Sequence, residues 1–243
     1  MEFQNTLLKA RFQKREKRFF IYAEKPDGTQ VIAHTNNTGS MRGLLATGAE
    51  VWLSPAQNPK RKLRWTLEII QTVEDEATGI QGGVLVGVNT IAANGLVHEA
   101  MRNNLIPGIS PDAEIKPEVK YGSRNSRIDF LVTDPSGGKC WVEVKNVSLV
   151  ENGHARFPDA PTERGRKHLQ ELEAMVKAGD RSLLVFCIQR DDAQSVGPAD
   201  DIDPEYGKLL RNVITGGVQV VGLACRVTPD GILSYKNIPI MIK

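Results

Sequence analysis

The chain has 243 residues, of which 40% are hydrophobic and 25% are charged. A sequence of this length and composition can bury a substantial core, as one large domain or two small ones, which argues against global disorder. Its start does not resemble a signal peptide, and no window approaches eighteen consecutive apolar residues. We therefore expect a cytoplasmic protein without a membrane partner.

Positive charge is concentrated at the front of the chain, although the formal net charge is only +2. Residues 1–66 contain twelve Lys and Arg against five Asp and Glu, so the remainder is acidic. A basic part that holds phosphates and an acidic part that holds a cation would produce this asymmetry. An ordinary solvated surface with unevenly placed charges is the alternative.

Cys140, Cys187 and Cys225 lie far apart, each inside an apolar run. An odd number of cysteines without close pairs indicates neither a disulfide framework nor a zinc site, and histidine spacing does not suggest zinc either. We expect buried free thiols.

Residues 1–80 are predicted to form an OB-fold-like barrel that binds nucleic acid. Turn signals separate short strands expected at 6–13, 18–24, 29–34, 49–54 and 63–73. Segment 36–45 is expected to hold a short helix, because an OB fold inserts one there. Such barrels bind single strands in a basic groove with stacking aromatic rings, although most rings here are expected to be core. The candidate binding residues are Lys14, Arg15, Lys17, Arg18, Arg42, Lys60, Arg61, Lys62 and Arg64.

Residues 81–243 change to an α/β pattern. The predicted elements are a helix at 90–104, strands at 114–120, 127–133 and 139–146, a helix at 162–178, a strand at 182–189, a helix at 204–215, and strands at 218–227 and 231–235. In the helix at 162–178, apolar side chains at helical spacing face the sheet and Gly179 ends the helix. Asp159 and Thr162, ahead of it, are interpreted as capping residues.

Two strands joined by a turn carry Asp129, Glu143 and Lys145. Because side chains alternate along a strand, Glu143 and Lys145 share a face, while Ile128 and Phe130 point away from Asp129. Asp129 joins the polar face if it pairs near Glu143, or through a bulge.

Buried carboxylates in an otherwise apolar sheet need a partner, and a divalent cation is the natural one. Asp129, Glu143 and the carbonyl of Val144 are the predicted ligands, with Glu99 binding directly or through water, and the oxygen donors suit Mg²⁺ or Mn²⁺. Together with Lys145, the acids would form a catalytic site for phosphodiester hydrolysis. An exposed Glu143–Lys145 ion pair is the alternative.

On the helix at 162–178, Arg164, Lys167, His168 and Glu171 recur at three- and four-residue spacing and so share a face. This face could meet the scissile phosphate through Arg164 and Lys167. A solvated face with internal ion pairs is an equal alternative.

The segments Arg-Ile-Asp and Trp-Val-Glu-Val-Lys resemble the PD-(D/E)xK phosphodiesterase signature, with Ile128 at the position before the aspartate where the signature has proline. Blocks at 94–100, 126–131, 142–149 and 157–172 resemble the sugar fermentation stimulation protein A family over nearly the whole chain, most specifically at 157–172. The resemblance implies an α+β protein with an N-terminal OB-type domain and a C-terminal restriction-endonuclease-like αβββαβ domain. It also implies non-specific DNA binding and a regulatory link to maltose metabolism.

Other enzyme classes lack their signatures: there is no Gly-x-Ser-x-Gly elbow, no Walker-type phosphate loop and no convincing helix-turn-helix. Two functions stay open. The first is a magnesium-dependent nuclease acting on DNA, with RNA as a further candidate. The second is a catalytically silent DNA-binding or regulatory protein that keeps the nuclease fold. The sequence leaves the oligomeric state open.

Overall fold

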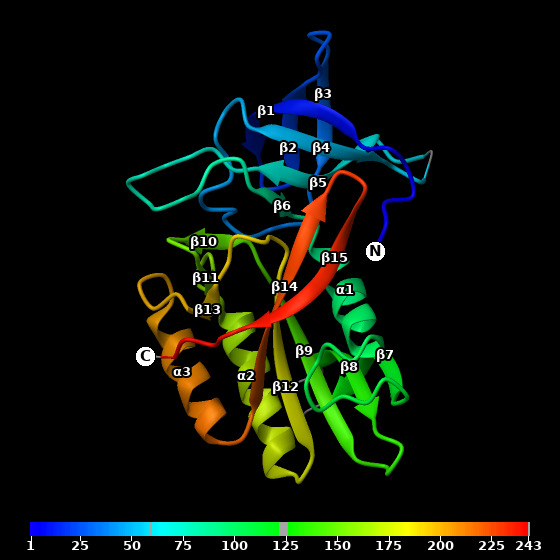
Figure 1. The fold of residues 1–243 in the computed structure, drawn as a ribbon, viewed down its shortest axis with the longest axis vertical. Helices are drawn as coiled ribbons and strands as arrows, with labels where there is room; N and C mark the ends of the chain where they lie inside the picture. Colours follow the sequence, from blue (N-terminus) through cyan, green and yellow to red (C-terminus); the bar gives the residue numbers. More distant parts are fainter. Residues whose placement is uncertain (59, 122–125, 243) are drawn as a thin grey trace.

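The computed structural model describes residues 1–58, 60–121 and 126–242. It contains a β-barrel and, below it in Figure 1, a mixed sheet flanked by helices. No helix among the described residues has the length and apolar character needed to cross a membrane. The mixed α+β class predicted from the sequence is confirmed.

The first six strands form the barrel. They are β1 (Leu8–Glu16), β2 (Phe20–Glu24), β3 (Gln30–His34), β4 (Glu50–Pro55), β5 (Trp65–Gln71) and β6 (Leu85–Gly87). Their order is β3-β2-β1-β4-β5-β6, and a short parallel pairing of β3 with β5 closes the barrel. Alternate apolar side chains fill its centre, which is why the five predicted strands form. β6 was not predicted and lies beyond residue 80, so a domain division at that residue stays a prediction.

The helix predicted within 36–45 was wrong. The structure has an irregular loop there with a turn at 42–44. Met41 and Gly43 adopt φ angles of 53° and 78°, and left-handed residues so close together do not allow a right-handed helix. The loop instead reaches the other domain.

The remaining elements form the C-terminal domain. Its helices are α1 (Thr90–Arg102), α2 (Glu163–Lys177) and α3 (Pro204–Thr215). Its strands are β7 (Glu114–Tyr121), β8 (Ser126–Thr133), β9 (Lys139–Val147), β10 (Leu149–Glu151), β11 (His154–Phe157), β12 (Arg181–Ile188), β13 (Ser195–Pro198), β14 (Gln219–Thr228) and β15 (Gly231–Ile238). The main sheet has the order β15-β14-β12-β9-β8-β7, in which β9, β12 and β14 run parallel.

Helices cover both faces of this sheet. Buried residues of α1 pack on one face, and those of α2 and α3 pack on the other (Figure 1). Thr162 caps α2 through a hydrogen bond from the N–H of Gly165 at 3.0 Å, and α2 ends before Gly179, as predicted. Strands β10, β11 and β13 form a small separate sheet that was not predicted, because three or four residues are too short to show a period.

Alternation along β8 is interrupted at Asp129. Phe130 belongs to the core on the α1 side, whereas Ile128 belongs to the core on the α2 side. The prediction that Ile128 and Phe130 point the same way was therefore wrong. On the neighbouring strand β7, Glu118 has a φ of 54° at the same level, between the pairs Pro117–Phe130 and Val119–Ile128. The irregularity that could carry Asp129 into the site is present in both strands.

Candidate nuclease site

Glu143 and Lys145 lie two residues apart on β9 and share its α2-facing side. The ammonium of Lys145 donates to Oε1 of Glu143 at 2.7 Å and lies 3.1 Å from Nδ1 of His168 on α2. His168 Nδ1 also contacts the same carboxylate oxygen. All three side chains are buried or nearly so, at 3%, 14% and 7% exposure. The alternative of an exposed Glu143–Lys145 pair on the surface is thereby excluded.

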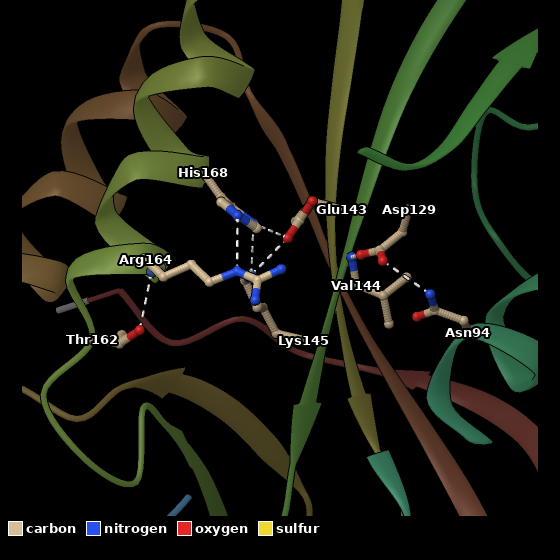
Figure 2. Close-up of polar contacts among 9 residues, drawn as sticks. Asn94, Asp129, Glu143, Val144, Lys145, Thr162, Arg164 and His168 are labelled. Atoms are coloured by element: carbon tan, nitrogen blue, oxygen red, sulfur yellow. Dashed lines mark hydrogen bonds and ion pairs between the residues drawn. The ribbon is translucent and has the colours of Figure 1, made fainter. Parts of the chain in front are cut away.

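Asp129 lies on the other side of β9, toward α1 (Figure 2). Its Oδ2 accepts the main-chain N–H of Val144 at 2.7 Å, and its Oδ1 accepts the side-chain amide of Asn94 at 2.9 Å. The β8–β9 ladder ends at the pair Phe130–Val142, one step before Asp129 would meet Glu143. The side chain of Asp129 thus binds an N–H that the ladder leaves free. The carbonyl of Val144 stays a predicted ligand.

The electrostatics of the two acids differ. Burial, and then the charge of Glu143, raise the pKa of Asp129. Burial by itself would also raise the pKa of Glu143, but the adjacent Lys145 and His168 lower it on balance. The two carboxylates are therefore close enough to repel each other, and only one of them has a cationic neighbour in direct contact.

Glu143 keeps an unused acceptor at the centre of the site. Its Oε2 is buried and has no hydrogen-bond partner among the described residues. An unsatisfied buried carboxylate oxygen is costly unless a cation or water binds it. In the described ranges no three His, Cys, Asp or Glu side chains gather closely enough to form a complete metal cage. Asp129 and Glu143 fit a Mg²⁺ or Mn²⁺ ion that is bound by one or two carboxylates and keeps several waters.

Glu99 does not join this cluster, which corrects the assignment made from the sequence. Its carboxylate lies 3.0 Å from the amino group of Met1, and its side chain is 40% exposed. Glu99 comes five positions after Asn94, and at about 100° per residue the two side chains point to different sides of α1. The helix therefore presents an amide, not an acid, to Asp129.

A cavity of about 760 Å³ opens beside the acids, between the two domains. The barrel contributes Arg18 and the loop 36–39, and the C-terminal domain contributes Lys145 and Arg164. This loop is fastened to the segment before α2, where Asp159 accepts the N–H of Met41 at 2.9 Å. Asp159 thus joins the domains and does not cap α2, which corrects its interpretation as a capping residue.

The predicted basic residues divide into three groups. Arg18 and Arg164 line the main cavity, and Lys167 lines a smaller one that shares Asp129 and Glu143 with it. Others have structural partners: Lys14 pairs with Glu16, Arg15 donates to the carbonyls of Asn37 and Gly39, Arg42 pairs with Glu151, and Arg61 donates to Thr66. Lys17, Lys60, Lys62 and Arg64 form the third group, whose members are exposed and line neither of these two cavities, whatever other contacts they make.

The α2 face is only partly solvated. Arg164 is exposed beside His168, with its Nε 3.4 Å from the ring Nε2. His168 and Glu171 are buried, at 6% and 5% exposure. This face of α2 therefore presents Arg164 and Lys167 at the cavities and buries His168 and Glu171, a distinction that spacing alone does not reveal.

Sequence reasoning gave no role to Asn94 or Glu118. Asn94 lies within the block at 94–100 that resembles the family, and on α1 it is next to the buried apolar residues. These two features were the available signals. Glu118 lines both cavities beside Asp129 with a left-handed backbone. In the sequence it is an ordinary charged strand residue, so no signal marked it.

Comparisons with known proteins agree with this architecture. The model of the sugar fermentation stimulation protein RE domain matches residues 91–231, and that of the SfsA N-terminal OB domain matches residues 14–80. A sugar fermentation stimulation protein homolog from Geobacter sulfurreducens is 44% identical over 228 residues, which is 94% of this chain and 93% of the relative. One from Paramagnetospirillum magneticum is 46% identical over 232 residues, covering 96% and 94%.

A solved structure, that of Pyrococcus furiosus SfsA in complex with Ca²⁺, has the same fold. It superposes with a TM-score of 0.87 at 24% identity and covers 100% of this chain and 98% of that one. The OB-type barrel followed by a restriction-endonuclease-type domain, predicted from the sequence, is confirmed. Two family models and relatives of matching length cover nearly all of the sequence, and the chain therefore belongs to the sugar fermentation stimulation protein family.

Proposed function

We propose that this protein binds nucleic acid without sequence preference and hydrolyses phosphodiester bonds with a divalent cation, with DNA as the first substrate and RNA as a further one. The observation that carries the proposal is the buried carboxylate of Glu143. Lys145 donates to one of its oxygens, the other has no hydrogen-bond partner among the described residues, and Glu143 lines the cavity. A buried acid, a lysine and a second acid on adjacent strands are what a metal-assisted nuclease requires.

Asp129 and Glu143 would hold the Mg²⁺ or Mn²⁺ ion. When bound, the ion supplies a Lewis acid that polarises a phosphoryl oxygen and lowers the pKa of a coordinated water. The charge of Glu143 raises the pKa of Asp129, and a cation between the two would relieve that repulsion. The structure of P. furiosus SfsA, solved in complex with Ca²⁺, supports a site for hard cations in this fold.

Lys145 and α2 would act on the phosphate. Lys145 Nζ, held by Glu143 and His168, would stabilise negative charge that develops on the scissile group. His168 is a positioning residue, since it contacts both members of the pair from α2. Arg164 is exposed at the same cavity and would contact a neighbouring phosphate.

A second function is a DNA-binding regulator of sugar metabolism, such as maltose use, that keeps the nuclease fold without turnover. The direct pairing of Glu143 with Lys145 favours it, because the ion pair partly neutralises the acid without a metal. The relatives are also named for sugar fermentation. Both functions predict salt-sensitive binding, so binding alone does not separate them.

Turnover separates the two. Pure protein is incubated with labelled single- and double-stranded DNA and RNA, with Mg²⁺, with Mn²⁺ or with a chelator. We expect metal-dependent cleavage that falls by roughly 10²–10³-fold in Lys145→Ala. Lys139→Ala, which changes an exposed lysine on the same strand, should keep full activity.

Two outcomes contradict the nuclease. Equal cleavage by the wild type and Lys145→Ala would identify a contaminating enzyme. Absence of cleavage on all four substrates, with either metal, would favour the DNA-binding regulator.

A further inference from the structure

A second cavity adjoins the main one beside the barrel. This second cavity has a volume of about 430 Å³, and Asn36 and Ile91 line both. Gln57 and Arg61 of the barrel also line it. We call the two adjoining cavities the groove: Asp129 of β8 and Glu143 of β9 line one part, the basic side chain of Arg61 lines the other, and Ile91 borders both.

Ile91 is the most exposed large hydrophobic residue that the structure describes. Its side chain is 69% exposed, although it lies in a groove whose other walls are mostly polar. Single exposed apolar residues are common on protein surfaces and alone require no explanation. Here the residue borders both parts of a groove that includes a nuclease-type site, where an apolar platform can contact the face of a nucleobase.

The backbone under Ile91 is held rigidly. Its N–H donates to the side chain of Asn89 at 3.1 Å, and Asn36 donates to the same oxygen at 3.0 Å. Asn89 in turn donates to Glu68 of β5 at 2.9 Å. Residues from both domains thus fix the position of Ile91, which favours a contact surface over a frayed helix end.

The volumes of the two cavities suit a few nucleotides of one strand. Cavities of about 760 and 430 Å³ are comparable with small-ligand sites of roughly 300–1,000 Å³. The barrel loop is fastened across one side, where Ser40 donates to the carbonyl of Asp159 at 2.7 Å and Arg15 holds the carbonyl of Asn37 at 2.6 Å. In a duplex each base is stacked between its neighbours, so a base can lie against Ile91 only where the strand is unpaired.

We infer that the groove binds one unpaired polynucleotide strand, with a phosphate at Glu143 and Lys145, a neighbouring base against Ile91, and the following backbone toward Arg61. The inference rests on the proposed function for the identity of the ligand and extends it to the substrate class. Single-stranded DNA and RNA share this chemistry. Duplex DNA would reach the site only where its strands separate, at an end or at a damaged position.

The test measures binding, so it does not depend on turnover. Fluorescent 12-residue DNA and RNA strands and a blunt duplex of the same sequence are titrated with the full-length Lys145→Ala protein in Mg²⁺ and with the wild type in a chelator. We expect both unpaired strands to bind at least tenfold more tightly than the duplex. The more tightly bound of the two identifies the sugar that the groove accepts.

Variants at Ile91 locate the contact. Ile91→Asp should weaken strand binding about tenfold and leave duplex binding nearly unchanged, whereas Ile91→Leu should bind like the wild type. An aspartate in the first turn suits a helix N-terminus, so the variant should fold, which circular dichroism checks. Ile91→Ser provides a second, uncharged variant. The matched control is Leu233→Asp, at an exposed leucine of β15 outside the groove.

Two results overturn the inference: duplex binding as tight as strand binding, or strand binding unaffected by both polar substitutions at Ile91. Failure of the proposed nuclease is a separate result. A protein that cleaves nothing but binds strands through Ile91 would remove the proposed hydrolysis and keep the groove. A protein that cleaves duplex and strand equally, without dependence on Ile91, would keep the proposed hydrolysis and remove the groove as the binding site for a single strand.

Discussion

Asn89, the capping residue of α1, donates a side-chain hydrogen bond to Glu68 of β5 at 2.9 Å. The amide oxygen of Asn89 also accepts the N–H of Ile91 and the side chain of Asn36. One side chain therefore begins the helix that carries Asn94 and connects that helix to the barrel. The position of Asn94, which donates to Asp129, and the contact between α1 and the barrel both depend on Asn89.

Replacing the cap should destabilise the protein. Asn89→Ala removes the cap of α1 and leaves the buried Glu68 with one partner fewer, so we expect a loss of about 1–3 kcal/mol in the free energy of unfolding, measured with urea. Asn103→Ala changes an exposed asparagine at the other end of α1 and should cost less than about 0.5 kcal/mol. Equal losses in the two variants would contradict the bridging role of Asn89.

Replacing Asp129 with a neutral residue should weaken metal binding and leave the stability of the metal-free protein nearly unchanged. Asp129→Asn removes the repulsion with Glu143, and Asn94 can rotate its amide to keep a hydrogen bond. We expect little change in thermal stability without metal, but loss of most of the stabilisation that millimolar Mn²⁺ gives the wild type. Calorimetric titration with Mn²⁺ gives the affinities. Unchanged Mn²⁺ affinity would remove Asp129 from the metal site.

Asp203 should contribute stability that depends on pH. It accepts the N–H groups of Thr162 and Tyr206 and pairs with Arg166 at 2.7 Å. Burial alone would raise the pKa of Asp203, but these N–H groups and the charge of Arg166 lower it below the usual 3.8. The folded state therefore binds the proton more weakly than the unfolded state, and the stabilisation is present above the usual pKa and lost as the pH falls through the lowered one.

The expected outcome for Asp203→Asn is a loss of about 1–3 kcal/mol in the free energy of unfolding at neutral pH, since the buried carboxylate loses its charge and its ion pair with the half-buried Arg166. The difference from the wild type should shrink as urea unfolding is repeated at pH values below the usual 3.8. Asp191→Asn, at an exposed position, should show no such trend. A difference that does not vary with pH would mean that charge is not responsible.

Two neighbouring arginines should behave differently. Arg18 is exposed at the cavity, so Arg18→Ala should weaken DNA binding and reduce the slope of log affinity against log salt by about one, with stability unchanged. Arg15 holds the carbonyls of Asn37 and Gly39, so Arg15→Ala should lower stability. Titrations over a salt series and thermal melts measure both effects. A salt slope that Arg18→Ala leaves unchanged would exclude a phosphate contact.

Most elements could be predicted because their residues repeat with a clear period. Strands β1 to β5 of the barrel and the helices α1, α2 and α3 lie within a few residues of their predicted bounds, whereas β6 was not predicted. The other exceptions depend on contacts between residues far apart in the chain. The helix in segment 36–45 was expected from the place of the segment in an OB fold, but contacts with Asp159 hold the segment as a loop, and β10, β11 and β13 are strands because they pair with one another.

The sequence by itself determined the pair Glu143 and Lys145, because strand alternation places residues two apart on one face whatever the fold. It also placed Asp129 on the adjacent strand, through the turn between β8 and β9. Tertiary structure decided which residue of α1 forms a hydrogen bond with Asp129. The orientation of α1 about its own axis places Asn94 beside the carboxylate of Asp129 and Glu99 beside the amino group of Met1.

Tertiary structure also decided what surrounds the pair. His168 reaches Glu143 because α2 packs on that face of the sheet, and Arg18 reaches the cavity because the barrel lies above it. Such contacts join residues far apart in the chain, and spacing does not encode the distance between separate elements. Short stretches of sequence thus specify Asp129, Glu143 and Lys145. The residues that contact them, and the groove beside them, arise only from the packing of α1, α2 and the barrel around the sheet.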